Sequence, residues 1–120
     1  MQLDPKDAAR LFDILEAADK ILRYTVGYNF KVFAGNDLLM DAVERNLEII
    51  GEASRNISGS FKESHPDVPW REIVALRNIL IHEYGRVRKE ELWEIVTIHL
   101  PRLREIVAGA MPAPPADQNL

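Results

Sequence analysis

Apolar residues recur at intervals of three and four along most of the chain, and this period constrains the fold more than any other feature. Residues that repeat in this way lie on one face of an α-helix. No strand-like alternation persists, and no internal repeat is evident. The sequence therefore predicts an all-α fold, an antiparallel bundle of four helices, or of five if Pro101 splits the last one. In the first helix we expect one buried stripe, made of Ala8, Leu11, Phe12, Leu15, Ala18 and Leu22.

Capping residues set the expected limits of the first two helices. Asp4 followed by Pro5 is typical of a helix start, and the apolar stripe continues to about Thr25. Gly27–Gly35 then interrupts the pattern, and its aromatic residues should pack this connection onto the bundle. Asn36 can cap a second helix, which the sequence ends at Ser58-Gly59-Ser60. The buried face of that helix should consist of Leu39, Val43, Leu47, Ile50, Ala53 and Ile57.

A third helix should follow a loop at Phe61–Val68. It is expected to begin at Pro69, where a missing amide hydrogen does no harm, and to end near His82, before Gly85. The helix is apolar over most of its circumference, so we expect it to be central in the bundle. Its one polar stripe consists of Arg71, Ala75, Asn78 and His82.

The last helix should extend over residues 88–108, bent or interrupted where Pro101 removes a backbone donor. Residues 1–110 then form one helical domain. The tail 111–120 contains several prolines and has no apolar period, so we expect it to be disordered.

Composition excludes several classes of function. The 120 residues include no cysteine, which rules out disulfides, cysteine-type zinc sites and thiol nucleophiles. No apolar run is long enough to span a membrane, and the first residues lack the layout of a signal peptide, so we expect a cytoplasmic protein. The net charge of −4 argues against a general nucleic-acid coat. Residues 71–89, however, hold five basic and two acidic residues, either a local phosphate-binding patch or solvated loop charges at Arg86, Arg88 and Lys89.

Arg77–Tyr84 places an arginine, an amide, an imidazole and a phenol at the end of an apolar helix. Charged side chains enter such a helix only where something compensates for their lost hydration. The order arginine, four residues, histidine, one residue, tyrosine resembles the motif of the HepT-like toxins, a branch of the HEPN ribonucleases. Arg77, His82 and Tyr84 fill that motif. The resemblance covers roughly residues 7 to 108 and includes Arg45–Ala53, His65–Ile73 and Leu92–Leu103.

The resemblance implies a HEPN-type bundle that forms a homodimer, with two motifs facing one another across a shared groove. It implies the toxin of a toxin–antitoxin system, an endoribonuclease that cleaves tRNA or mRNA without a cofactor. RNA cleavage by its own 2′-hydroxyl needs proton transfer, which suits His82, and positive charge on the phosphorane, which suits Arg77. No step of this scheme requires a metal, and the three histidines lack ligand-like spacing.

Three further residues could belong to the site, Asn78 and Tyr84 through the resemblance and Asn46 because it projects from the apolar face of its helix. Asn78 fills the polar position after the arginine that the family commonly shows, and Asn46 on the second helix could lie beside the catalytic cluster. The phenol of Tyr84 is implied as the position where a small nucleotidyltransferase antitoxin of the MntA type attaches adenylate and silences the ribonuclease.

Each residue also has a simpler interpretation. His82 could only interact with the helix dipole, and Asn46 could be a core amide satisfied by its neighbours. Tyr84 could close the core with its ring. Arg77 could form a salt bridge within the bundle, to one of Glu44, Glu48 or Glu52.

Arg77 and His82 are five residues apart, about 140° around an ideal helix, so they do not share a face. They converge only if the arginine reaches around, the helix loosens near Gly85, or a second subunit presents its copy. The alternative function is a non-catalytic module that binds a nucleotide or docks a minimal nucleotidyltransferase. A purely structural dimerisation domain is a third possibility, which gives the Arg77 cluster no purpose.

Overall fold

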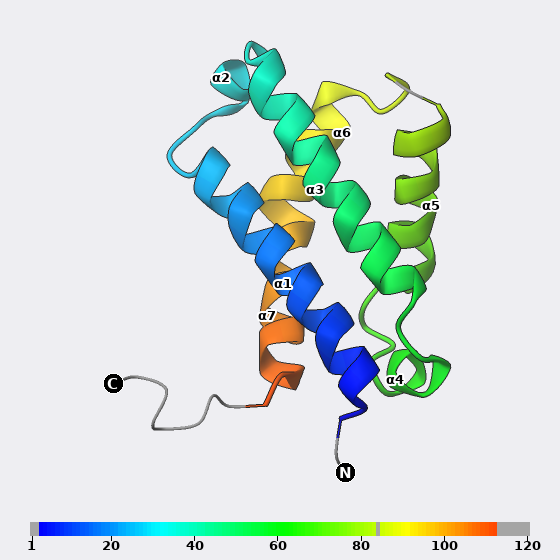
Figure 1. Ribbon diagram of the computed structural model, residues 1–120. Coiled ribbons are helices and arrows are strands. Elements are labelled where there is room, and N and C mark those ends of the chain that lie inside the picture. Colours follow the sequence, from blue (N-terminus) through cyan, green and yellow to red (C-terminus); the bar gives the residue numbers. More distant parts are fainter. Residues whose placement is uncertain (1–2, 84, 113–120) are drawn as a thin grey trace.

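The structure, a computed structural model, describes residues 3–83 and 85–112. Every regular element in these ranges is a helix, which confirms the predicted all-α bundle (Figure 1). The long segments are α1 (Pro5–Thr25), α3 (Asp37–Arg55), α5 (Trp70–His82) and a C-terminal run made of α6 (Lys89–Glu94), η1 (Ile95–His99) and α7 (Leu100–Ala110). Two short helices, α2 (Phe30–Ala34) and α4 (Gly59–Ser64), form parts of the connections that we expected to be loops.

The helix α3 is the middle element of the molecule. It packs against α1 on one side and α5 on the other, and the C-terminal run packs behind α1 (Figure 1). The expectation that α5 is central is therefore wrong. Of its residues only Trp70 and Leu80 are buried, and Ile81 is 41% exposed. The apolar circumference of α5 predicted more neighbours than one copy of the chain supplies.

The helix ends follow the predicted caps closely. The Asp4 carboxylate accepts a hydrogen bond from the Lys6 amide (2.7 Å), and the Asn36 side chain accepts one from the Leu39 amide (3.0 Å). α3 ends at Arg55, earlier than predicted, because Ser58 instead caps the short helix α4. α5 ends at His82, because Glu83 already leaves helical geometry with a φ of −127°, and Gly85 follows with a φ of +80°, a conformation that favours glycine.

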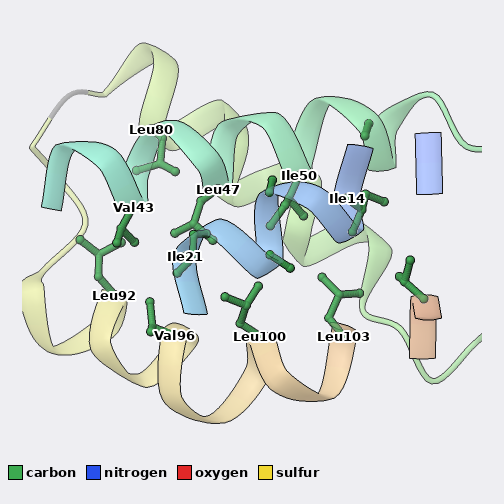
Figure 2. Packing of buried hydrophobic residues seen from close by; sticks show 14 of the residues in the cluster. Ile14, Ile21, Val43, Leu47, Ile50, Leu80, Leu92, Val96, Leu100 and Leu103 are labelled. Carbon is green, nitrogen blue, oxygen red and sulfur yellow. The ribbon is translucent and has the colours of Figure 1, made fainter. Parts of the chain in front are cut away.

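The core lies where α1, α3 and the C-terminal run meet (Figure 2). All six apolar residues predicted for the second helix are buried there. In α1 the predicted stripe is only partly correct, since Leu11 and Ala18 are fully buried but Phe12 is 54% exposed. Ile14 and Ile21 are buried in its place. The predicted stripe and the face that is in fact buried both have a helical period. Packing of α1 against α3 and α7 selects the face that is buried.

The predicted interruption of the last helix is confirmed as a wide π-turn at Ile95–His99. The Leu100 amide bonds to the Ile95 carbonyl, five residues back. Pro101 follows at once; it has no amide hydrogen, and in an α-helix its ring would collide with the carbonyl four residues before it. The wider turn relieves that conflict.

The predicted tail 111–120 begins within the described residues. Met111, the first residue of the predicted tail, packs against the core, and residues 113–120 of that tail lie outside the described residues.

In the α1–α3 connection Phe33 is fully buried against Trp93, as expected, whereas Tyr28 is 43% exposed. No helix in the described ranges is long and apolar enough to cross a membrane.

Candidate functional site

Arg77 lies at a close approach of α5 to α3. Gly51 of α3 is buried at this point, and a Cβ atom placed on it would lie 2.2 Å from the Arg77 Cβ. The same atom would lie 3.3 Å from the Ile73 carbonyl oxygen. Only a hydrogen fits in this space, so Gly51 allows the two backbones to meet and thereby sets the position of Arg77.

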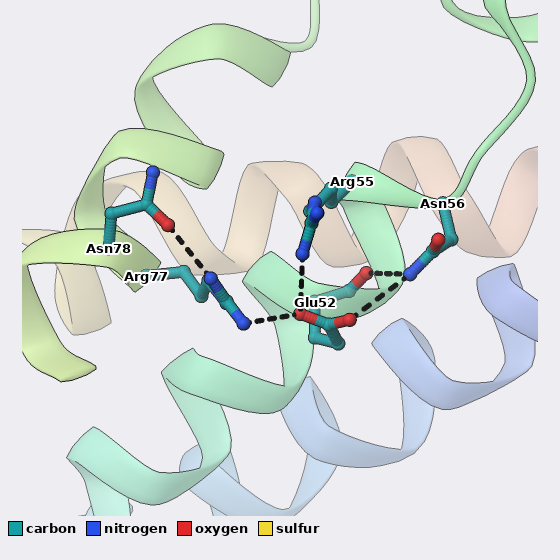
Figure 3. A network of polar contacts seen from close by, with 5 residues as sticks. All are labelled: Glu52, Arg55, Asn56, Arg77 and Asn78. Carbon is teal, nitrogen blue, oxygen red and sulfur yellow. Dashed lines mark hydrogen bonds and ion pairs between the residues drawn. The ribbon is translucent and has the colours of Figure 1, made fainter.

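Two polar neighbours orient the Arg77 guanidinium (Figure 3). Its Nη2 lies 2.8 Å from Glu52 Oε2 on α3, and its Nη1 donates to Asn78 Oδ1 at 2.9 Å. Glu52 also accepts a hydrogen bond from Asn56 (3.3 Å) and lies 3.8 Å from the Arg55 guanidinium. Among the three carboxylates considered as partners of Arg77, the fold thus selects Glu52.

The Arg77 side chain is only 19% exposed, and its Nε atom is buried without a hydrogen-bond partner. A guanidinium has five N–H donors in a fixed plane, so Glu52 and Asn78 do not occupy all of them. The side chain reaches a groove of about 260 Å³ between α1, α3 and α5. Arg77 therefore combines a fixed orientation with an opening toward an incoming anion.

His82 lies apart from this groove. It is the last residue of α5 and exposed, and it shares the solvent-facing edge of the helix with the other members of the predicted polar stripe, Arg71, Ala75 and Asn78. The Glu83 amide bonds to the Ile79 carbonyl (2.8 Å), so the helix remains regular through His82. Loosening of α5 therefore does not bring His82 toward Arg77. The structure places Arg77 and Asn78 together and leaves the imidazole at the edge of the molecule.

Two further residues were predicted to belong to the site, Asn46 and Tyr84. Asn46 is buried, and its amide donates to the Ala42 carbonyl on its own helix (2.9 Å), which is the arrangement expected of a satisfied core amide. Tyr84 lies outside the described residues. Within the described ranges no group of three or more histidine, aspartate or glutamate side chains could hold a metal ion.

The basic loop after α5 is engaged by its neighbours. Arg86 pairs with Glu83, and Arg88 pairs with Glu91 at 3.0 Å. Lys89 donates to the Ala34 carbonyl at the end of α2 (3.0 Å). These contacts agree with the interpretation of this segment as solvated, locally paired loop charges.

A run of carboxylates follows α3 toward its N-terminus. Asp41, Glu44 and Glu48 line a shallow hollow beside Leu80 and Ile81 of α5. Burial, together with the neighbouring Asp41 and Glu48 carboxylates, raises the pKa of Glu44 above its ordinary value. The end of α5 is therefore bordered by negative charge on its α3 side.

A family match covers most of the chain and agrees with the all-α fold. The sequence profile described as Ribonuclease HepT-like matches residues 14–109. The chain belongs to the HepT-like ribonuclease family. That match includes α3, with Gly51 and Glu52, and the whole of α5.

Relatives of this HepT-like chain carry ribonuclease names. "Putative RNase MJ1380" of Methanocaldococcus jannaschii is 46% identical over 82% of this chain and 91% of its own length. "Probable ribonuclease HepT" of Thermococcus cleftensis is 44% identical over 78% of this chain and 86% of its own length. No solved structure matches the chain at a significant level.

Two residues that shape the HepT-like site were not identified from the sequence as parts of it. Gly51 has a detectable signal, because glycine in a helix interior costs about 1 kcal/mol relative to alanine and calls for a reason. Glu52 was one of three equally spaced candidates, and only the register of α3 against α5 distinguishes it.

Proposed function

We propose that this HepT-like protein is a metal-independent endoribonuclease and the toxin of a toxin–antitoxin pair that acts on RNA in the cytoplasm. The observation that supports the activity is the placement of Arg77, held by Glu52 and Asn78 and open to a groove. The chain's relatives named as ribonucleases support the same activity.

In the proposed reaction the 2′-hydroxyl of the RNA attacks the adjacent phosphorus, and the bond from phosphorus to the 5′-oxygen breaks. A base takes the proton from the 2′-hydroxyl, and an acid gives a proton to the leaving 5′-oxygen. Arg77 stabilises the charge on the equatorial oxygens through its planar donors. His82 transfers protons, since the ordinary pKa of histidine lies near neutrality.

The two residues would act across a homodimer. Arg77 faces the α3 side of α5, whereas His82 occupies the outer edge of the same helix. A second copy that docks along this edge would bring its own His82 toward the Arg77 groove. Each site would then combine the arginine of one copy with the imidazole of the other, which would take the proton of the 2′-hydroxyl and return it to the leaving 5′-oxygen. Asn78, which bonds Arg77 and shares the outer edge with His82, would connect the two parts of the site.

Incubation of the purified protein with total tRNA in EDTA tests this activity. We expect cleavage that survives chelation, yields ends with a 2′,3′-cyclic phosphate, and disappears in both His82→Ala and Arg77→Ala. Arg23→Ala, an exposed arginine on α1 outside the Arg77 groove, serves as the control and should cleave normally. Equal cleavage by wild type and His82→Ala would reject the assignment.

The proposed control of the toxin acts through Tyr84. A cognate nucleotidyltransferase antitoxin of the MntA type would attach adenylate to its phenol, and the added phosphate would compete with RNA for Arg77. Expression without the partner should slow growth, and coexpression should restore it while adding about 329 Da per adenylate to the Tyr84 peptide. Tyr84→Phe should remain toxic in the presence of the partner. An unmodified Tyr84 peptide beside an active partner would leave complex formation as the means of control.

One observation favours a second candidate function. The Arg77 charge is already matched by Glu52, as it would be in a non-catalytic module that binds a nucleotide or docks a nucleotidyltransferase. Such a protein would bind its partner without cleaving RNA under any of the conditions above, so the same experiment separates the two functions.

A further inference from the structure

Three arginines from three different helices line the groove that Arg77 reaches. Arg10 comes from α1, Arg45 from α3 and Arg77 from α5. These helices lie side by side, with α3 in the middle (Figure 1). Neighbouring helices pack roughly 8–10 Å apart, so the groove leads from Arg77 across about 16–20 Å of surface to α1. This length exceeds what a single phosphate needs.

Arg10 and Arg45 differ from most other arginines in the described part of the chain. Arg77 pairs with Glu52, whereas the side chains of Arg10 and Arg45 are exposed and form no ion pair with any described residue. The other arginines with a carboxylate partner are Arg55, Arg86, Arg88 and Arg104. Two unpaired guanidinium groups thus gather in the same groove as the proposed catalytic arginine.

The groove also contains three carboxylates, Asp13, Glu48 and Glu52, so its lining carries no net charge. A duplex laid over the groove would be repelled by these carboxylates as well as attracted by the arginines. A single strand is narrow enough to follow the arginines, and each guanidinium can bind a phosphate oxygen pair with parallel N–H donors. The groove therefore favours a single-stranded backbone over a duplex.

We propose that this groove binds the phosphodiester backbone of single-stranded RNA beside the scissile phosphate, with Arg10 and Arg45 each contacting one phosphate. The inference rests on the proposed ribonuclease function, because it takes Arg77 as the position of the bond that is cleaved. Arg10 and Arg45 are binding residues, and they take no part in proton transfer.

The salt dependence of RNA binding tests this proposal. Fluorescein-labelled single-stranded RNA of mixed sequence is titrated with His82→Ala protein, which should not cut it, at several KCl concentrations. Each phosphate contact to a single strand contributes about 0.7 to the slope of log Kd against log salt. Arg10→Gln and Arg45→Gln should each reduce the slope by about 0.7, and the double variant by about 1.4.

Arg23→Gln is the matched control, since it removes the same charge from an exposed position of α1 that does not line this groove. Arg10→Lys and Arg45→Lys should keep the salt slope, because the charge remains, but weaken binding, because the paired donors are lost. Equal slopes for the double glutamine variant and Arg23→Gln would overturn the proposal. Thermal melts of each variant show whether the fold is intact.

Cleavage by proteins that retain His82 separates this proposal from the proposed function. The Arg10 and Arg45 variants should raise KM and leave kcat nearly unchanged. If the wild type cleaves RNA while KM and salt slope are unaffected, the groove assignment is wrong and the ribonuclease remains. If the wild type does not cleave but the slope falls as expected, the groove binds RNA and the ribonuclease assignment fails.

Discussion

Glu52 and the RNA phosphate would compete for the same donors of Arg77. Glu52 is half-exposed, and it can move without becoming unpaired, because Arg55 and Asn56 lie beside its carboxylate (Figure 3). Asn78 and the contact with Gly51 would still hold the arginine in place after Glu52 leaves. The ion pair in the free protein is therefore an exchangeable contact.

Glu52→Gln should consequently lower KM for RNA. The neutral amide still accepts a hydrogen bond from Arg77, but it no longer opposes a phosphate. We expect a two- to fivefold decrease, about 0.5–1 kcal/mol, which is typical of a partly exposed ion pair. Steady-state kinetics on a single-stranded substrate measures this. A fall in kcat at unchanged KM would instead mean that Glu52 is needed to orient Arg77.

Gly51→Ala should destabilise the fold and impair the site. Its methyl group would overlap the Arg77 Cβ, so α5 must move away from α3. The cost should be about 1–3 kcal/mol, partly offset by the better helix propensity of alanine. Gly109→Ala in α7, where nothing lies within 4 Å of the new methyl, should be neutral or stabilising. Thermal melts and cleavage assays of both variants measure the difference, and equal stability of the two would show that the α3–α5 contact is looser than described.

At the scale of single elements, the helix α3 carries a carboxylate whose charge opposes folding. The pKa of Glu44 is raised by burial and by Asp41 and Glu48. Below the ordinary pKa of 4.5 both the folded and unfolded states are protonated and no penalty exists. As the pH rises from there, the unfolded state releases its proton first, so stability falls until the pH exceeds the folded-state pKa.

Glu44→Gln should therefore stabilise the protein at neutral pH by about 0.2–0.5 kcal/mol for each like-charge neighbour relieved. The gain should shrink as the pH decreases and vanish below the ordinary pKa of the carboxyl. Chemical denaturation of the wild type and of Glu44→Gln between acid and neutral pH measures how the difference in their free energies of unfolding changes. Glu63→Gln on the exposed surface of α4 is the control and should show no such trend. A gain that is independent of pH would assign the effect to packing.

Helix ends were predictable because caps act locally. Asp4 and Asn36 each accept a hydrogen bond from a backbone amide two or three residues later, as the sequence predicted. Gly85 was expected to stop α5, but the backbone leaves helical geometry two residues before it, at Glu83. Which face of α1 is buried was not predictable. Phe12 and Ile14 both continue a helical period, and only contacts with other helices decide which of the two side chains is buried. The short helices escaped notice because five or six residues show no clear period.

The residues of the candidate site were likewise predictable only where they are close together in the sequence. Its motif residues are neighbours along the chain, so the sequence shows them directly. Glu52, Arg10 and Arg45 join Arg77 only through the register of three helices. Register depends on how side chains fit between elements, and Gly51 is the one local trace of it in the sequence.

At the scale of the whole molecule, the separation of Arg77 from His82 predicts complementation between subunits. A mixture of Arg77→Ala and His82→Ala proteins, each inactive alone, should regain activity after exchange of subunits. If each site takes its arginine from one copy and its histidine from the other, random pairing restores about a quarter of the wild-type activity. Light scattering should report twice the chain mass of 13.7 kDa. A mixture that remains inactive, although mixed dimers form, would place both residues of a site in one subunit.

The attachment of α5 has a consequence for hydrogen exchange. This helix carries the motif, yet it packs mainly on α3 and buries only Trp70 and Leu80, whereas α3 is covered on both sides. Amides open to solvent at rates set by local rather than global free energy where few apolar contacts hold a segment. Deuterium should therefore enter the last turns of α5 well before the middle of α3, and docking of a second subunit along the outer edge should slow that uptake. The proposed catalytic helix would then become fully ordered only in the dimer, so a dilute monomer would be inactive even while it remains folded.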